Sequence, residues 1–187
     1  MGVGLETGTD IEIEDINKNN LEDIPEPCGG CVYWESPAEF DQKKLDRRQF
    51  QARKREWFEK TTREFGTCGK IVYHEGKPIA YAQYAPSDQL TGTSRHKLKQ
   101  VGKIEEGVIF LSCLYVTNKK FRDKGIGEKL LQTIIEDLRR RGYKAIETVA
   151  RRSEAYNPSG PVLFYVRNGF HVKNNADPEY PLMRLLL

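Results

Sequence analysis

The stretch RDKGIGEKLL, residues 122–131, joins an apolar run to an amphipathic one through two glycines that are separated by one residue. Glycine lets a backbone take unusual dihedral angles and lets a ligand approach closely. The first N–H groups of a helix have no partner within the helix, and the helix dipole favours negative charge there. The stretch therefore predicts either an anion-binding turn, most often for phosphate, or a tight strand-to-helix turn that binds nothing.

The segments on both sides of this turn predict a βαβ unit. Residues 107–116, GVIFLSCLYV, form a nearly continuous apolar run of strand length, as expected of a central buried strand. After the turn, apolar residues recur on one helical face up to Gly142, which ends the helix, and residues 143–150 form the next strand. Two strands joined by a helix in this way are expected to run parallel.

The rest of the chain predicts further strands and helices around this unit. An edge strand is expected at 11–16, a loop at 21–37, a helix at 38–65 that breaks near 43–48, hairpin strands at 70–74 and 78–84, an exposed loop at 86–104, a short helix ending at Asn168-Gly169, and a strand over 181–187. The apolar face of the first helix is expected at Phe50, Trp57, Phe58 and Phe65, and Gly66 is expected to end that helix.

Composition restricts the class of protein. The chain has 187 residues, of which 38% are hydrophobic and 30% charged, which fits one globular α/β domain with an appendage. The sequence contains no apolar run of membrane-spanning length and no secretory signal pattern, so a cytoplasmic location is expected. A net charge of +3 is too balanced to indicate nucleic-acid binding, and four cysteines without an export signal do not indicate a disulfide framework.

Two motifs carry a resemblance to a known family. The turn lacks the P-loop pattern, and Leu130 stands where a Rossmann fingerprint needs its third glycine. The glycine turn has the pattern Arg122-x-x-Gly125-x-Gly127 and lies between a central strand and a helix. This pattern resembles the cofactor motif of the GNAT superfamily of N-acetyltransferases. Residues 164–170, FYVRNGF, resemble the same family's last core helix and the turn that follows it. The resemblance is good over 66–175 and vague over 1–65.

The resemblance implies an α/β (α+β) fold: a mixed, mostly antiparallel sheet whose central parallel strand pair is splayed, with flanking helices. It also implies one domain over 1–187. Within that domain, 66–187 is the expected acetyl-CoA-binding core, and 1–65 is an N-terminal cysteine-rich, aromatic and helical region that is less like the family.

The resemblance further implies how acetyl-CoA is bound. Backbone N–H groups at the helix start hold the pyrophosphate, and Arg122 and Lys124 add positive charge. The splayed strand offers backbone groups to the pantetheine arm and to the acetyl carbonyl, and Asn157 contacts the arm beyond the pyrophosphate. The residues expected at the cofactor are Leu114, Tyr115, Val116, Arg122, Asp123, Lys124, Gly125, Ile126, Gly127, Glu128, Asn157 and Tyr165.

The implied reaction is direct attack of a primary amine on the thioester. Tyr165 matches the family's general acid, which protonates the leaving thiolate, although a helix tyrosine that only packs against the sheet explains it almost as well. An amine must first lose a proton, but residues 107–116 contain no acid. Three acids lie near this strand in the sequence: Glu105, Glu106 and Glu147. Glu147 is the candidate base, although each of the three is also explained as an ordinary surface charge.

Other features have competing interpretations. Cys28-Gly-Gly-Cys31 suggests zinc or redox chemistry, but the other cysteines and histidines show no paired spacing, so packing or acceptor-site lining is favoured and no metal is expected. The segment Tyr33-Trp34-Glu35 either lines a site for a cationic acceptor or anchors a loop with buried aromatics. The basic segment 43–55 is better explained as a solvated helix face than as an RNA or lipid site.

The acceptor is not identified by the sequence, since a small amine and a protein amine both fit. A homodimer is common in such families. The competing function is a non-catalytic acyl-CoA-binding or regulatory module that docks nucleic acid through its basic helix. The missing acid on the central strand favours that alternative slightly, and the retained Tyr165 argues against it.

Overall fold

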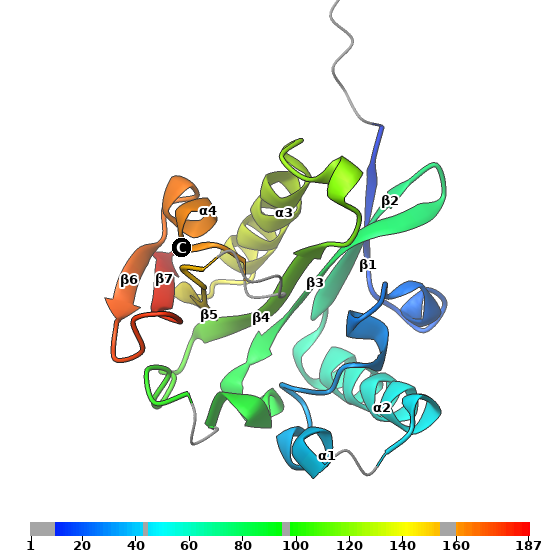
Figure 1. Ribbon diagram of the computed structural model, residues 1–187, viewed down its shortest axis with the longest axis horizontal. Coiled ribbons are helices and arrows are strands. Elements are labelled where there is room, and N and C mark those ends of the chain that lie inside the picture. The colour runs from blue at the N-terminus through cyan, green and yellow to red at the C-terminus, as the bar shows by residue number, and fades with distance from the viewer. Residues whose placement is uncertain (1–9, 43–44, 95–97, 154–159) are drawn as a thin grey trace, which may run out of the picture.

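A computed structural model describes residues 10–42, 45–94, 98–153 and 160–187 (Figure 1). Asn157 and the basic residues 95–97 lie outside the described residues. The strands are β1 (Glu12–Asp15), β2 (Gly69–His74), β3 (Lys77–Pro86), β4 (Val108–Val116), β5 (Ala145–Val149), β6 (His171–Asn174) and β7 (Leu182–Leu186). The α-helices are α1 (Pro37–Gln42), α2 (Arg47–Phe65), α3 (Ile126–Arg140) and α4 (Val162–Arg167).

The seven strands form one sheet in the order β1-β2-β3-β4-β5-β7-β6. All neighbouring strands are antiparallel except β4 and β5, which are parallel. This parallel register runs only from Val108 opposite Ala145 to Phe110 opposite Glu147, although β4 continues to Val116. The predicted mixed sheet with a splayed central parallel pair is therefore confirmed.

Helices α3 and α4 cover one face of the sheet (Figure 1). The apolar side of α3 is buried as its sequence predicts, because residues spaced three and four apart share one side of a helix. The buried residues of α3 are Ile126, Leu130, Leu131, Ile134, Ile135 and Leu138. They pack with residues of β3, β4 and α4 in one hydrophobic cluster, and this side is called the α3 face below.

Helix α2 covers the opposite face, called the α2 face below, together with the chain before α1 and the segment between β3 and β4. The predicted break after α1 is confirmed, and α2 starts at a capping box in which Asp46 and Gln49 bond each other's backbone N–H groups. The prediction that four aromatic residues line the buried face of α2 was only partly right. Phe58 is buried, but the other deeply buried residues of α2 are Lys54 and Thr61.

The prediction of an exposed loop at 86–104 was only partly right for the residues of this segment that the structure describes. Leu90, Val101 and Ile104 are buried in the α2-face cluster. A Cβ atom at Gly92 would lie 2.6 Å from the Cα of Trp34, so this polar segment packs directly against the chain before α1. Its burial depends on that distant segment rather than on its own composition.

Strand β6 was not predicted, because its four residues, HVKN, lack an alternating apolar pattern. It pairs with β7, and β7 lies inside the sheet between β5 and β6. Among the helices that the structure describes, none is both long and apolar enough to cross a membrane.

Candidate active site

The glycine turn opens α3 without a side-chain cap. Gly125 is the N-cap residue with φ +75°, and no side chain among the described residues caps the helix there. The first intrahelical bond runs from the Lys129 N–H to the Gly125 carbonyl at 2.9 Å, so the N–H groups of the preceding turn are left to an external acceptor. A Cβ atom at Gly125 would meet no described heavy atom within 4 Å. The turn therefore has both the donors and the space that an anion needs.

Arg122 ties this turn to the end of β4. Its Nε donates to the Val116 carbonyl at 2.9 Å, and one of its terminal nitrogens donates to the Thr117 carbonyl at 3.1 Å. Its guanidinium also lies 5.7 Å from the centre of the Tyr115 ring. The sequence indicated only the charge of Arg122, whereas the structure shows that the side chain also fixes the strand–turn junction.

Strands β4 and β5 separate at the level of Leu111. Beyond Phe110 the backbones no longer pair, and the Thr148 hydroxyl donates to the Leu111 carbonyl at 2.8 Å. The register of β4 against β3 also shifts here, since Tyr84 faces Leu111 and Gln83 faces Cys113. The end of β4 that follows, residues 114–116, is joined to the glycine turn through a short 3-10 helix, Lys119–Phe121, and through the hydrogen bonds of Arg122, so the splayed strand and the turn lie at one junction.

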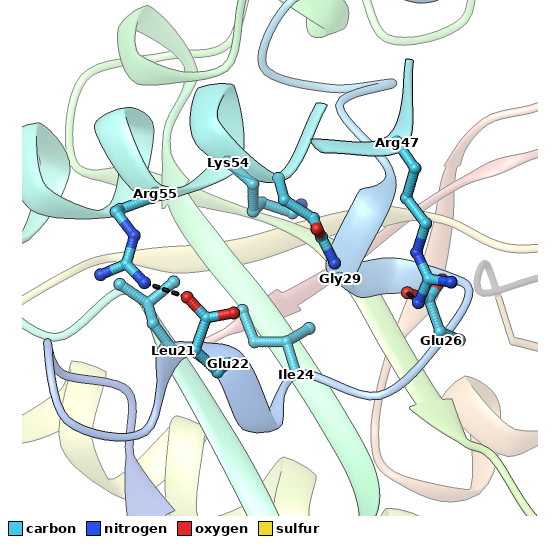
Figure 2. A pocket seen from close by; sticks show the side chains of 9 residues that line it. Leu21, Glu22, Ile24, Glu26, Gly29, Arg47, Lys54 and Arg55 are labelled. Carbon is cyan, nitrogen blue, oxygen red and sulfur yellow. Dashed lines mark hydrogen bonds and ion pairs between the residues drawn. The ribbon is translucent and has the colours of Figure 1, made fainter. Parts of the chain in front are cut away.

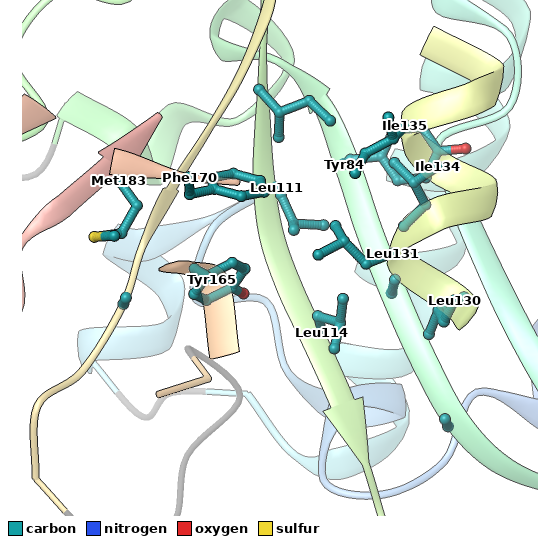
Figure 3. Close-up of a cluster of buried hydrophobic side chains, with 14 of the residues drawn as sticks. Tyr84, Leu111, Leu114, Leu130, Leu131, Ile134, Ile135, Tyr165, Phe170 and Met183 are labelled. Carbon is teal, nitrogen blue, oxygen red and sulfur yellow. The ribbon is translucent and has the colours of Figure 1, made fainter. Parts of the chain in front are cut away.

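Tyr165 lies beside this separation on the α3 face. Its side chain is buried between Phe164 and Phe170, and its hydroxyl points toward β4 (Figure 3). Burial raises the pKa of Tyr165 well above that of an ordinary tyrosine. The phenol is therefore protonated at neutral pH and holds a proton near the separating strands.

Glu147 is the last residue of β5 that pairs with β4. Its side chain lies on the α2 face, because Ala145 and Val149 belong to the α2-face cluster and residues two apart in a strand share a face. Its side chain is fully buried, and Oε1 accepts from Lys173 Nζ at 2.6 Å and lies 3.5 Å from Arg184 Nε. Oε2 is buried and has no hydrogen-bond partner among the described residues. One carboxylate oxygen is thus held by cations, and the other is available to a donor.

The other acids near β4 are different. Glu105 is exposed and accepts hydrogen bonds from Arg184 and Lys173. The hydrogen bond from Arg184 has the largest effect on the pKa of Glu105, and together the two partners lower it to about 2. Glu106 is exposed. Of the three acids considered from the sequence, Glu147 alone is buried at the strand separation.

A second buried ion pair, between Lys54 and Glu35, was missed by the sequence reasoning. Lys54 Nζ donates to Glu35 Oε1 and, at 2.8 Å, to Gln83 Oε1, while the Trp34 N–H donates to Glu35 Oε2 at 3.1 Å. Both charged side chains are almost fully buried. The sequence did contain an indication that Lys54 is buried, because Lys54 lies one turn before Phe58 on the apolar face of α2. Glu35 therefore takes its cation from inside the protein, which favours the loop-anchoring interpretation of this segment.

Two pockets lie beside the segments that cover the α2 face. The smaller pocket, of about 150 Å³, is bordered by the ion pairs Arg55–Glu22 and Arg47–Glu26, and it includes Lys54 (Figure 2). The larger, of about 750 Å³, is lined by residues of the segment between β3 and β4 that lie within 87–94 and 98–104. Neither pocket is lined by the 122–128 turn.

The four cysteines are free thiols. Burial raises the pKa of Cys31 to about 11 and the pKa of Cys68 to about 12, so both thiols are protonated and weakly nucleophilic at neutral pH. Within the described ranges, no three His, Cys, Asp or Glu side chains are grouped to hold a metal ion. These observations favour packing over metal or redox chemistry for Cys28 and Cys31.

Three arginines of α2 pair with acids. Arg47 pairs with Glu26, Arg53 with both Glu39 and Glu56, and Arg55 with Glu22. A nucleic-acid site needs cations that face phosphate rather than carboxylate. The structure thus favours the solvated-face interpretation of this helix.

Comparison with known proteins places the chain among acetyltransferases. A family model described as the acetyltransferase (GNAT) family matches residues 30–170. None of the curated proteins matches the chain. A ribosomal-protein-alanine N-acetyltransferase from Brucella melitensis has a similar fold, with a TM-score of 0.59 and 19% identity over 94% of this chain and 99% of the other.

Two further structures contain a ligand. PaiA N-acetyltransferase from Thermoplasma acidophilum, in complex with coenzyme A, matches with a TM-score of 0.57 and 17% identity over 95% of this chain and 99% of the other. N-acetylglutamate synthase from Neisseria gonorrhoeae, complexed with coenzyme A and N-acetyl-glutamate, matches with a TM-score of 0.52 and 14% identity over 96% of this chain and 36% of the other. At these identities the structures show a shared fold.

Proposed function

The protein belongs to the GNAT acetyltransferase family, and from that premise we propose that it transfers the acetyl group of acetyl-CoA to a primary amine. Acetyl-CoA is the acyl donor of this family and the cofactor of this protein. The observation that carries the proposal is the uncapped start of α3 at Gly125, which offers N–H donors and open space at the end of a splayed strand.

This geometry supports a particular set of cofactor-binding residues. The N–H groups from Lys124 to Glu128 would bind the pyrophosphate, with Lys124 supplying charge and Arg122 holding the turn against β4. The backbone of Leu114, Tyr115 and Val116 would bind the pantetheine arm, since β5 does not pair with this part of β4. Acetyl-CoA would supply an activated thioester, whose sulfur is a better leaving group than an alcohol oxygen.

Residues from the two faces would move the protons. Tyr165 would protonate the departing sulfur from the α3 face, because its buried phenol keeps its proton at neutral pH. Glu147 would accept a proton from the attacking amine through its unpartnered Oε2, on the α2 face. The amine acceptor would therefore enter from the α2 side, opposite Tyr165.

The test is acetylation of a panel of amines by the purified protein. The panel contains small amines, amino acids and peptides with free N-termini or lysines, and mass spectrometry detects the acetylated product. Transfer to at least one amine, with release of one coenzyme A for each acetyl group, is expected. Tight binding of acetyl-CoA without transfer to any amine would instead support the regulatory module.

A further inference from the structure

A cluster of charged side chains lies on the α2 face, where β5, β7 and β6 run side by side. Glu147 of β5 and Arg184 of β7 are opposite each other in the strand register, and Lys173 comes from β6. Lys173 Nζ contacts Glu105 Oε1 at 3.2 Å and Glu147 Oε1 at 2.6 Å. The cluster therefore extends from the exposed carboxylate of Glu105 to the fully buried carboxylate of Glu147.

Glu105 occupies a place that is shaped for a carboxylate. Arg184 donates to it from both terminal nitrogens, to Oε1 at 3.1 Å and to Oε2 at 3.0 Å. A planar guanidinium recognises a carboxylate through such a pair of hydrogen bonds, and Lys173 adds a third donor at 3.2 Å. These contacts, first the hydrogen bond from Arg184, lower the pKa of Glu105 to about 2, so the two cations favour an anion between them.

The carboxylate of Glu105 can be replaced by that of a ligand. The Glu105 side chain is 60% exposed and comes from the segment that precedes β4. Its backbone carbonyl accepts from the Val108 N–H at 3.2 Å, so the side chain can turn into solvent while the backbone stays in place. Exposed ion pairs contribute little to stability, and the loss of this one therefore does not prevent the exchange.

The buried end of the cluster lacks a donor. Glu147 Oε1 accepts from Lys173 at 2.6 Å, but Oε2 is buried and has no hydrogen-bond partner among the described residues. A buried carboxylate oxygen without a donor is unfavourable, and an amine or ammonium N–H of a ligand would supply one. When Glu105 turns away, Lys173, Arg184 and Glu147 together carry one net positive charge, which favours a ligand that also has a carboxylate.

We propose that the acceptor is an α-amino acid with a free carboxylate, which displaces Glu105 from Arg184 and Lys173 and presents its amine to Glu147. This inference rests on the proposed function and names the acceptor class for the same site. Glu105 and Glu147 share Lys173 Nζ, so a carboxylate in the place of Glu105 lies close to Glu147. The amine of an α-amino acid is on the carbon next to the carboxyl group, which fits this short separation. A peptide N-terminus has a neutral amide there instead.

The experiment compares L-amino acids with their amides, in which a neutral carboxamide replaces the carboxylate. Release of coenzyme A from acetyl-CoA is followed for each acceptor. We expect kcat/KM to be roughly 10- to 100-fold higher for at least one amino acid than for its amide, because the amide loses the charge-assisted hydrogen bonds. The amine of the amide is less basic and more often unprotonated, so amine reactivity would favour the amide and cannot produce this preference.

Two matched variants test the role of Glu105. Glu105→Gln removes the competing carboxylate, and Glu106→Gln removes the same charge from the neighbouring exposed residue. The KM for the amino acid should be about three- to tenfold lower in Glu105→Gln than in Glu106→Gln, while the KM for the amide should be similar in both. Arg184→Lys keeps the charge but loses the paired hydrogen bonds, so the preference for the carboxylate should fall by about tenfold.

The outcomes separate this inference from the proposed function. Equal kcat/KM for amino acids and amides, or equal KM values in the two glutamine variants, would overturn the inference while acetylation of any amine keeps the proposed function. Without any acetylation the proposed function is rejected, and calorimetric titration of the same amino acids and amides into the coenzyme A complex tests the site alone. Binding of an amino acid but not its amide, tighter in Glu105→Gln, would support the site, and no binding of amino acids would reject it.

Discussion

The two faces of the sheet are built from different kinds of sequence. On the α3 face, the glycine turn, the helix after it and Tyr165 follow one another within a short stretch of chain. On the α2 face, the buried pairs Lys54–Glu35 and Lys173–Glu147 join segments that are distant in sequence. The difference indicates that the proposed acetyl-CoA side of this protein is specified by local motifs, while the proposed acceptor side depends on long-range contacts.

The largest expected effect is on the α3 face, at Tyr165. Tyr165→Phe removes the proposed general acid and keeps the buried ring, so kcat should fall by about 10² to 10⁴. Binding of acetyl-CoA, measured by calorimetry, should stay unchanged. Tyr143→Phe is the matched control, since Tyr143 is a half-buried tyrosine at the far end of α3. Equal activity of the two variants would mean that Tyr165 only packs.

The corresponding test on the α2 face is Glu147→Gln. The change removes the proposed base without altering side-chain size, and kcat for amine transfer should fall by about 10². Glu105→Gln is the control, because Glu105 contacts the same Lys173 and Arg184 but is exposed. A loss in the control as large as in Glu147→Gln would show that the charge cluster, and not Glu147, is what matters.

The buried ion pair should dominate the stability of the α2 face. Lys54→Met leaves the Glu35 carboxylate buried without its cation, so the free energy of unfolding should fall by about 3 to 5 kcal/mol in urea titrations. The double variant Lys54→Met with Glu35→Gln removes both charges and should recover much of that loss. If the double variant is as unstable as the single one, packing around Lys54 matters more than its charge.

The thiols of the α2 face should make stability depend on pH. Their pKa values are raised on folding, to about 11 for Cys31 and about 12 for Cys68, so their contribution is complete below pH 9 and is lost as pH rises. Each thiol should reduce the free energy of unfolding by about 1 kcal/mol between pH 9 and pH 10, because the thiol of the unfolded chain ionises near pH 9.

This dependence is measured by urea unfolding under reducing conditions at pH 8, 9 and 10. The variant with Cys31→Ser and Cys68→Ser should lose less stability than wild type over this range, because serine does not ionise there. Tyrosine ionisation affects both proteins alike, so the difference between them isolates the thiols. An identical pH dependence in the two proteins would contradict the assignment.

Features that depend on local motifs could be predicted from the sequence, whereas features that depend on long-range contacts could not. The spacing of Gly125 and Gly127, the apolar side of α3 and the run at 107–116 are local signals, and each led to the right element. The segment 86–104 looks exposed because it is polar, yet Gly92 packs against Trp34, and no local pattern reports that contact. Lys54 was interpreted as a solvated charge because the acid that neutralises it lies in another segment.

The predictions of the site residues differ in the same way. The turn and Tyr165 could be located from motifs, and the structure brings them to one strand junction. Glu147 is the candidate base from the sequence as well, but only the structure gives a physical reason to prefer it over Glu105, because Glu147 is buried and Glu105 is exposed. Thr148 gave no signal, because a threonine in a strand is ordinary until the strand beside it separates. The division of the chain at residue 65 and the homodimer remain predictions.

The start of α3 is proposed to bind the phosphates of acetyl-CoA. Calorimetric titration of acetyl-CoA into the protein measures this binding. Gly127→Glu places a carboxylate at the helix start, where a Cβ atom meets neighbours no closer than 3.6 Å, so the variant should fold. Gln132→Glu, exposed further along α3, adds the same charge as a control. Binding that persists in wild type and Gln132→Glu but is lost in a folded Gly127→Glu is the predicted result. Equal binding by all three proteins would contradict it.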